Sequence, residues 1–400
     1  MNEQLVVKNF GPIKDATVDF KRVTVFIGPT GGGKSTLAKL AAVFRELRLY
    51  TSGRNGIETS LRGYGIDFVS APSFIDWQLK KLNIQLSNEK WGFSFQEEIK
   101  DEAFNLAKKT AELNQKAQAL LNAQQNGTHD SASHSQQMTA IKTELESLDI
   151  FFAQNAALGK PRYIPAERML VSILDEAWPA LVRNKIGLPP TLSFFAEGFL
   201  QARSEVKKLH TAIFDVGFEH INGRDFIRLP LVGLVALTKA ASGIQSATPM
   251  LVLLEYLSRN TEQAQSFIIE EPELNLYPTA QQGLLNWLVE KCTKGENDLT
   301  ITTHSPYLLA HFNLLLYAYQ VAENHPDRAD DVARIVPRES WINPKEFAAY
   351  HVEGQQDNGV RSIVNPETGL ISHNSLDSTA SAETAEFEKL LDINAGMEIE

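Results

Sequence analysis

Hydrophobic and polar positions alternate over the first 27 residues of the chain. Three segments rich in β-branched and aromatic side chains predict strands, and the Gly11–Pro12 pair marks a turn between the first two. We expect these strands at residues 5–10, 16–20 and 23–27. The period then changes, because apolar residues over 36–49 recur at the spacing of an amphipathic helix. Residues 83–96 predict a hairpin that turns at residues 87–89.

Strands and helices alternate again in the second half. Apolar runs predict strands at 162–166, 266–270 and 299–303, and β-rich sequence also covers 218–237. Helical patterns separate these strands and extend to about His210 in the first interval. Further strands are expected at 347–354 and 362–372, and a last helix at 384–393. This alternation favours a layered α/β fold with a largely parallel sheet.

Between these halves, residues 97–158 are rich in Ala, Leu, Glu, Lys and Gln, and a polar loop at 126–135 interrupts them. The pattern predicts a helical hairpin, either partly packed on the body or projecting as a short coiled-coil arm. We therefore divide the chain into four parts. They are a first lobe at 1–96, the helical insertion at 97–159, a second lobe at 160–349 and a small β/α extension at 350–400.

Composition limits the possible functions. With 43% apolar and 22% charged residues, the 400-residue chain can form a large core. The net charge of −11 argues against a protein that coats DNA, although a local basic groove remains open. The single cysteine, Cys292, argues against disulfides and cysteine-rich zinc sites. We see no signal peptide and no apolar run near the ~18 residues of a membrane span, so we expect a cytoplasmic protein without a membrane partner.

A glycine-rich segment joins the third strand to the first helix. It fits the pattern G-x-x-x-x-G-K-[ST], in which backbone N–H groups and a helix N-terminus surround phosphate groups. We expect Lys34 to reach the β- and γ-phosphates of ATP and the Ser35 hydroxyl to ligate Mg²⁺. An ordinary strand-to-helix turn is the structural alternative. The predicted nucleotide-binding residues are Gly28, Pro29, Thr30, Gly31, Gly32, Gly33, Lys34, Ser35 and Thr36.

Two carboxylates end the predicted strand at 266–270. Consecutive strand residues point to opposite faces, so Glu270 and Glu271 are expected to differ in role. We assign Glu270 to the Mg²⁺ shell and Glu271 to the attacking water as general base. His304 ends the next strand and can hydrogen-bond a γ-phosphate or that water. The alternatives are a charged strand end that caps a helix and a structural histidine.

A second helix start lies in the segment AASGIQS, at residues 240–246. Ser242, Gly243 and the helix N-terminus form another end that can bind anions, unless Ser242 is only an N-cap. Because the glycine-rich loop already surrounds this chain's own nucleotide, the second end suggests contact with a nucleotide on another subunit.

Taken in order, these motifs resemble the ABC-type ATPase heads, and the chain is similar to the SMC, RecF and OLD-related ATPases. The segments that carry the resemblance are residues 1–50 and 160–350, including YIPAER at 163–168. It implies a P-loop head with a mixed sheet and a homodimer that encloses two ATP molecules. It also implies signature residues Ser242, Gly243 and Gln245, a dimer-contacting loop at 274–276 and His304 as the switch histidine.

The sequence departs from that family at two points. Glu270 stands where the heads usually have Asp, and no glutamine marks the loop after the 162–166 strand, which instead holds Glu167 and Arg168. Arg168 could contact phosphate or form a structural ion pair. Beyond His304, no D-x-D cluster marks the nuclease domain of OLD-type enzymes. Four arginines after the first helix form either a DNA-facing patch or a solvated face: Arg45, Arg48, Arg54 and Arg62.

We therefore predict an ATPase that dimerises over Mg-ATP and regulates a separate effector, such as a nuclease or toxin in antiphage defence. Glu271, His304 and Lys34 are its predicted catalytic residues. The first alternative is a DNA repair ATPase that binds DNA directly. The second is the nucleotide-binding subunit of a membrane transporter, a class that lacks the YIPAER segment.

Overall fold

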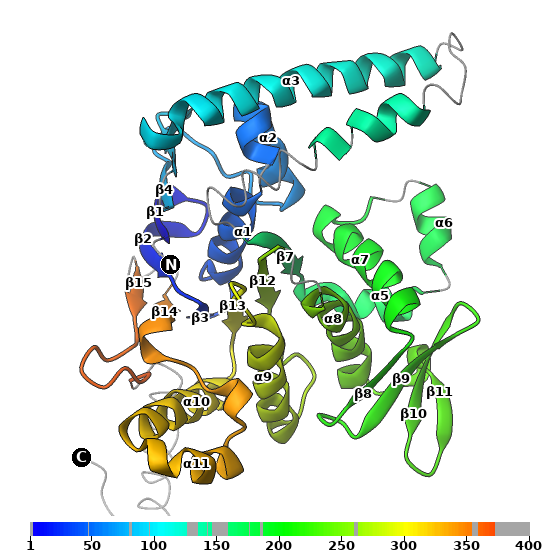
Figure 1. Ribbon diagram of the computed structural model, residues 1–400, viewed down its shortest axis with the longest axis vertical. Coiled ribbons are helices and arrows are strands. Elements are labelled where there is room, and N and C mark those ends of the chain that lie inside the picture. The colour runs from blue at the N-terminus through cyan, green and yellow to red at the C-terminus, as the bar shows by residue number, and fades with distance from the viewer. Residues whose placement is uncertain are drawn as a thin grey trace, which may run out of the picture.

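Three β-sheets and the helices packed around them form the part of the chain that the computed structural model describes (Figure 1). The described residues are 3–46, 48–79, 82–95, 97–125, 135–141, 143–145, 159–175, 177–184, 187–259, 263–353 and 359–372. Among them, no helix is both long and apolar enough to cross a membrane.

The central sheet has six strands drawn from the whole length of the chain. In spatial order they are β15 (Val360–Ser362), β14 (Phe347–Val352), β3 (Val23–Ile27), β13 (Asp298–Thr303), β12 (Gln265–Glu270) and β7 (Lys160–Ile164). The five strands from β14 to β7 are parallel, and β15 runs antiparallel at the edge. The fold is thus a mixed α/β fold, as expected.

Two antiparallel sheets flank this centre. The first orders its strands as β2 (Ile13–Phe20), β1 (Glu3–Phe10), β4 (Phe74–Leu79), β5 (Leu82–Ser87) and β6 (Lys90–Phe95). The second orders β11 (Gly233–Ala236), β10 (Arg224–Leu229), β9 (Val216–Ile221) and β8 (Lys208–Thr211). The hairpin of β5 and β6 confirms the turn predicted at residues 87–89. Its loop residues, Asn88 and Glu89, both have positive φ, as in the two-residue turns that match strand twist.

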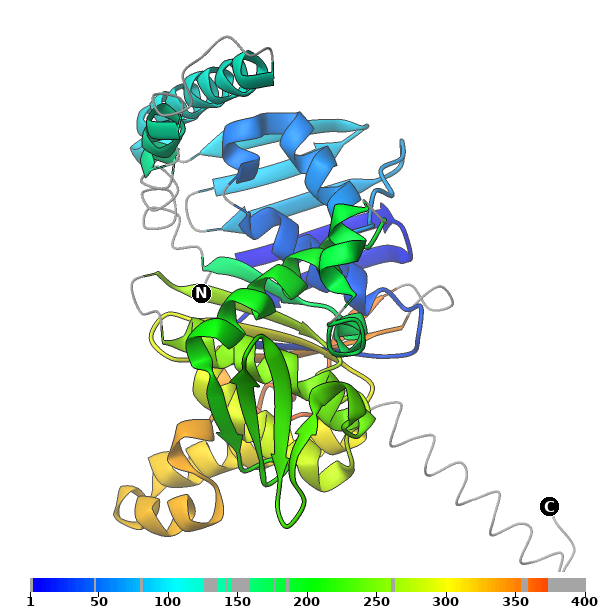
Figure 2. The same ribbon diagram turned by 90° about the vertical axis from the view of Figure 1, so that its right-hand side faces the viewer.

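Helices cover both faces of the central sheet. On one face pack α1 (Lys34–Arg45) and α2 (Arg48–Gly63), which lie against the five-stranded sheet (Figure 2). On the other face pack α7 (Pro190–Val206), α8 (Ser242–Ser258), α9 (Pro278–Cys292) and α10 (Pro306–Asn324). Shorter helices are η1 (Ala166–Arg168), α5 (Met169–Ile173), α6 (Trp178–Arg183), η2 (Leu237–Lys239), η3 (Pro326–Arg328), α11 (Ala329–Ile335), η4 (Arg338–Ser340) and η5 (Pro344–Glu346).

Alternating strand residues divide the interior into two cores. In β12, Phe267 and Ile269 join the core beneath α7–α10, whereas Ile268 joins the core beneath α1. In β3, Val25 joins the core beneath α7–α10, and Phe26 joins the core beneath α1. The side of the sheet that α1 covers is therefore the side of the even-numbered β12 residues, which include Glu270.

The insertion contains a long helix, α3 (Glu97–Gln125), which runs along the top of Figure 1 away from the sheets. Residues 135–141 and 143–145 are also helical, and Lys109 in α3 pairs with Glu144 at 2.7 Å. These two helical runs are thus in contact, and the hairpin arm as a whole stays a prediction. The loop tip and the predicted helix at 384–393 lie outside the described residues.

Some boundaries differ from those expected. The helix predicted over 36–49 ends at Arg45, because Glu46 turns to extended backbone. The Glu46 carboxylate accepts hydrogen bonds from Ser60 of α2 and from Tyr64, in the turn that follows α2. His210 lies in strand β8 rather than at a helix end. Strand β14 pairs with β3 in the central sheet, so the division proposed at residue 350 falls within a strand.

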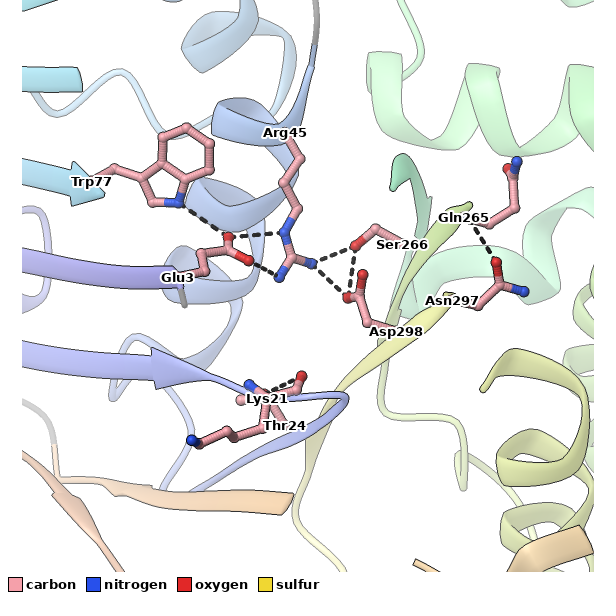
Figure 3. A network of polar contacts seen from close by, with 9 residues as sticks. All are labelled: Glu3, Lys21, Thr24, Arg45, Trp77, Gln265, Ser266, Asn297 and Asp298. Atoms are coloured by element: carbon pink, nitrogen blue, oxygen red, sulfur yellow. Dashed lines mark hydrogen bonds and ion pairs between the residues drawn. The ribbon is translucent and has the colours of Figure 1, made fainter. Parts of the chain in front are cut away.

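The prediction that Arg45 belongs to a surface basic patch is wrong. Its side chain is 1% exposed, and its guanidinium donates to the Glu3 carboxylate at 2.7 and 2.9 Å and to Asp298 at 2.8 Å (Figure 3). Trp77 also donates to Glu3, and Ser266 donates to Asp298. Arg45 lies on the inner face of α1, and this network joins α1 to β1, β4, β12 and β13.

Candidate functional site

The glycine-rich loop lies at the carboxyl end of β3, close to the backbone of Val352 and the side chain of Ile13. A Cβ atom at Gly28 would lie 2.2 Å from the carbonyl oxygen of Val352 at the end of β14. A Cβ atom at Gly33 would lie 2.2 Å from the Ile13 side chain at the β1–β2 turn. Both glycines also have positive φ, a conformation that residues with a side chain rarely adopt. At Gly28 a side chain would also collide with the Val352 backbone. The loop is thus held in one shape by parts of the chain far apart in sequence.

Helix α1 begins within this loop, at Lys34, and its first N–H groups have no partner within the helix. Such a helix start attracts anions. The Lys34 Nζ donates to the carbonyls of Gly28 and Pro29, both at 2.9 Å, and the residue is 5% exposed. Burial lowers the pKa of Lys34, while the charges of Glu271, Glu270 and Glu273 raise it. The ammonium group is thus poised at the loop and within the field of three carboxylates.

Glu270 ends the fully buried strand β12 on the side covered by α1. It is 5% exposed, and its buried Oε1 has no hydrogen-bond partner among the residues that the structure describes. A buried carboxylate oxygen without a donor fits a metal ligand, and the Ser35 hydroxyl in the first turn of α1 is a second suitable donor. No group of three or more His, Cys, Asp or Glu side chains forms a metal cluster in the described ranges. Magnesium held with phosphate does not require such a cluster.

Glu271 has a left-handed backbone, with φ of 41°, which is uncommon for a residue with a side chain. Its N–H donates to the carbonyl of Thr302 at 2.9 Å. Its carboxylate Oε1 lies 3.3 Å from Nε2 of His304, which ends the neighbouring strand β13. Burial and the charge of Lys34 lower the pKa of His304, while Glu271 raises it. Lys34, Glu270, Glu271 and His304 thus gather at the carboxyl ends of three adjacent strands.

The sequence analysis did not identify Glu273 as part of this site. Its Oε1 accepts hydrogen bonds from the Thr303 hydroxyl at 2.5 Å and from the His304 backbone N–H at 3.0 Å. The side chain is buried, and burial raises its pKa. Glu273 therefore fixes the backbone that carries His304. The sequence feature that could have identified Glu273 is its position as the third glutamate of the EEPE segment, residues 270–273.

Arg168 adopts neither of the two roles expected for it. The guanidinium is fully buried and donates to the backbone carbonyls of Pro165, Glu270 and Glu271. Its partners are main-chain oxygens, and it forms no ion pair among the described residues. Because these carbonyls already accept from its N–H groups, the guanidinium is not directed at a phosphate. Sequence patterns cannot reveal such a contact, because its acceptors are backbone atoms.

The predicted signature residues lie against a different part of the site. Ser242 is exposed and begins α8, and a Cβ atom at Gly243 would lie 2.6 Å from the carbonyl oxygen of Asn275. The Gln245 side chain donates to Thr238. Within the described residues, no hydrogen bond or ion pair joins these three residues to the glycine-rich loop. Of the three, Gly243 is the one that the structure places against residues 274–276.

A phosphate-binding loop between a strand and a helix, with carboxylates and a histidine at the adjoining strand ends, defines the P-loop ATPases. The model of the AAA ATPase domain family matches residues 75–309. This chain belongs to that family, which confirms the expectation of an ATPase. No curated protein matches the chain in sequence.

The solved structures that are similar to this chain include two SMC heads and a RecF protein. The SMC head domain from Thermotoga maritima is 13% identical, with a TM-score of 0.37, over 78% of this chain and 92% of that one. A Pyrococcus furiosus Smc head bound to the C-terminal domain of ScpA is 11% identical, with a TM-score of 0.38, over 90% of this chain and 95% of that one. The recombination mediator RecF is 10% identical, with a TM-score of 0.33, over 90% of this chain and 97% of that one.

Proposed function

We propose that this protein binds and hydrolyses Mg-ATP at the site formed by the glycine-rich loop, Glu270, Glu271 and His304. The observation that carries the proposal is the convergence of an ammonium group, two carboxylates and an imidazole at the carboxyl ends of β3, β12 and β13. Ligands of open α/β sheets bind at that edge.

Each side chain then has a distinct role. The loop N–H groups and Lys34 bind the phosphates, and Lys34 offsets charge on the transferred phosphoryl group. Glu271 accepts a proton from the attacking water, and His304 holds the Glu271 carboxylate and the γ-phosphate. A Mg²⁺ ion bound by Ser35 and Glu270 would neutralise charge on the phosphates.

The arrangement of the signature residues supports a homodimer. Ser242 is exposed, and the next residue, Gly243, lies against Asn275 and Leu276. We propose that Ser242, Gly243 and Gln245 contact the nucleotide of a second copy, so that ATP closes two copies and hydrolysis releases them. Such a switch would regulate a separate effector in antiphage defence, a step that depends on the family resemblance alone.

ATP turnover by Lys34→Ala and Glu271→Gln tests the core of this proposal. We expect Lys34→Ala to bind ATP weakly, because it loses the ammonium group that contacts phosphate. Glu271→Gln should bind ATP but hydrolyse it about 10²- to 10⁴-fold more slowly, because it loses the general base. Phosphate release measures turnover, and light scattering after gel filtration measures dimerisation with ATP.

Matched control variants are Lys294→Ala and Glu296→Gln, which replace exposed residues of the α9–β13 connection. Both should keep wild-type turnover. If Glu271→Gln hydrolyses ATP as fast as wild type, the catalytic assignment is wrong. Stable dimers of Glu271→Gln with ATP would support the closed form.

A further inference from the structure

Arg168 reaches the catalytic strand end because of strand pairing. Strand β7 runs parallel to β12, with Ile164 opposite Ile269, so the residues that follow β7 lie beside those that follow β12. Helix η1 then turns the Arg168 side chain inward, where it is 0% exposed. Its two terminal nitrogens donate to the carbonyls of Glu270 and Glu271, each at 2.7 Å. One guanidinium therefore binds two consecutive peptide groups.

These two peptide groups flank the Cα atom of Glu271. The peptide between Glu270 and Glu271 is held at both ends, since its carbonyl accepts from Arg168 and its N–H donates to Thr302. The carbonyl of the following peptide accepts from the other nitrogen of Arg168. Both torsions of Glu271 are thus fixed from outside, at a left-handed φ that a glutamate rarely adopts unaided.

The charge of Arg168 also suits this place. Burial lowers the pKa of Arg168 to about 10, while the charges of Glu273, Glu271 and Glu270 raise it, so the group stays protonated at neutral pH. A cation among these carboxylates reduces their mutual repulsion. Lysine could supply the charge, but a single ammonium lacks the planar pair of donors that spans two carbonyls.

We propose that Arg168 is a positioning residue that holds Glu271 in its left-handed conformation and so aims the carboxylate at the attacking water and His304. The inference rests on the proposed function, because it requires that Glu271 act on ATP. It assigns to the YIPAER segment a role in catalysis without contact with the nucleotide.

The test compares Arg168→Lys and Arg168→Gln with wild type. For Arg168→Lys we expect kcat to fall about 10- to 100-fold, because a small displacement of a catalytic group has effects of that size. The KM for ATP should change less than about threefold, since the phosphate-binding groups are untouched. Arg168→Gln, which loses the charge as well, should be at least as slow. Phosphate release measures both constants, and the thermal midpoint measures folding.

Arg203→Lys is the matched control. Arg203 is 13% exposed and pairs with Asp175 and Asp225, away from the catalytic strand ends. This variant should lose thermal stability but keep wild-type kcat. A general loss of stability would therefore lower the midpoint of both arginine variants, whereas a loss of positioning lowers kcat only at residue 168.

The outcomes separate the inference from the proposed function. If wild type does not hydrolyse ATP, the proposed function is wrong. If wild type hydrolyses ATP, Glu271→Gln does not, and Arg168→Lys keeps kcat within about threefold, only the positioning role is wrong. The same conclusion follows if KM rises as much as kcat falls, or if neither residue-168 variant folds. A selective loss of kcat in folded Arg168→Lys supports the proposal.

Discussion

At the scale of single residues, the site depends on charges that are partly removed from water. His304 lies between the Lys34 ammonium and the Glu271 carboxylate, and burial disfavours its charged form. The imidazole is therefore neutral at pH 7 and can share a hydrogen bond with Glu271. On acidification it becomes protonated and pairs with the carboxylate, which then serves poorly as a base.

This arrangement predicts the acid limb of the pH–rate profile. Because the pKa of His304 is lowered from 6.5, kcat should stay constant as the pH falls through 7 and decline only below about 6.5. Single-turnover phosphate release between pH 5 and 9 measures this, with the surface variant His325→Gln as the control. An acid limb centred above pH 7 would contradict the assignment.

At the scale of elements, the Arg45 network fixes α1, and with it the glycine-rich loop, to four strands. Arg45 lies at the C-terminal end of α1, and Lys34 lies at the N-terminal end. The buried guanidinium binds Glu3 of β1 and Asp298 of β13 at once. It is also 5.0 Å from the Phe20 ring centroid, in a cation–π contact. Helix α1 therefore cannot shift without breaking buried charged contacts.

We expect Arg45→Met to lower the free energy of unfolding by about 3–5 kcal/mol, because two carboxylates remain buried without a cation. Replacing all three charges, with Glu3→Gln, Arg45→Met and Asp298→Asn, should cost less than Arg45→Met alone. Urea denaturation measures both, and Arg62→Met, on the exposed face of α2, is the control. If Arg45→Met is as stable as wild type, this network does not stabilise the fold.

The sequence predicted these elements far better than their contacts. The β-branched run of β12 and the apolar period of α10 are local features, so their positions followed from pattern alone. The functions of Arg45, Arg168 and Glu273 depend instead on atoms distant in sequence, several of them backbone oxygens. Arg45 looked like a surface arginine because a helix pattern does not reveal which polar residue faces a buried carboxylate.

At the scale of the whole molecule, the proposed dimer predicts that the site is completed by a second copy. The loop that would bind phosphate and the exposed start of α8 belong to separate parts of the surface, and a two-fold dimer would bring each together with its counterpart. The family match covers residues 75–309 and so includes α8, β12 and β13.

Mixing two inactive variants tests the composite site. In a mixed dimer of Lys34→Ala and Ser242→Arg, one site carries both changes and the other carries neither. We expect each variant alone to be inactive and the equimolar mixture to regain about a quarter of wild-type turnover, since half of the dimers are mixed and each has one intact site. Ser87→Arg, at an exposed strand end, is the control and should keep full activity. A mixture as inactive as its components would argue against the shared site.

The close approach of Val352 to Gly28 has a consequence for biosynthesis. Strand β3, made among the first residues, has as its neighbours β13 and β14, which the ribosome completes only at residues 303 and 352. Until then the glycine-rich loop lacks the backbone against which Gly28 packs. The glycine-rich loop therefore reaches its final packing only after the ribosome has made residue 352.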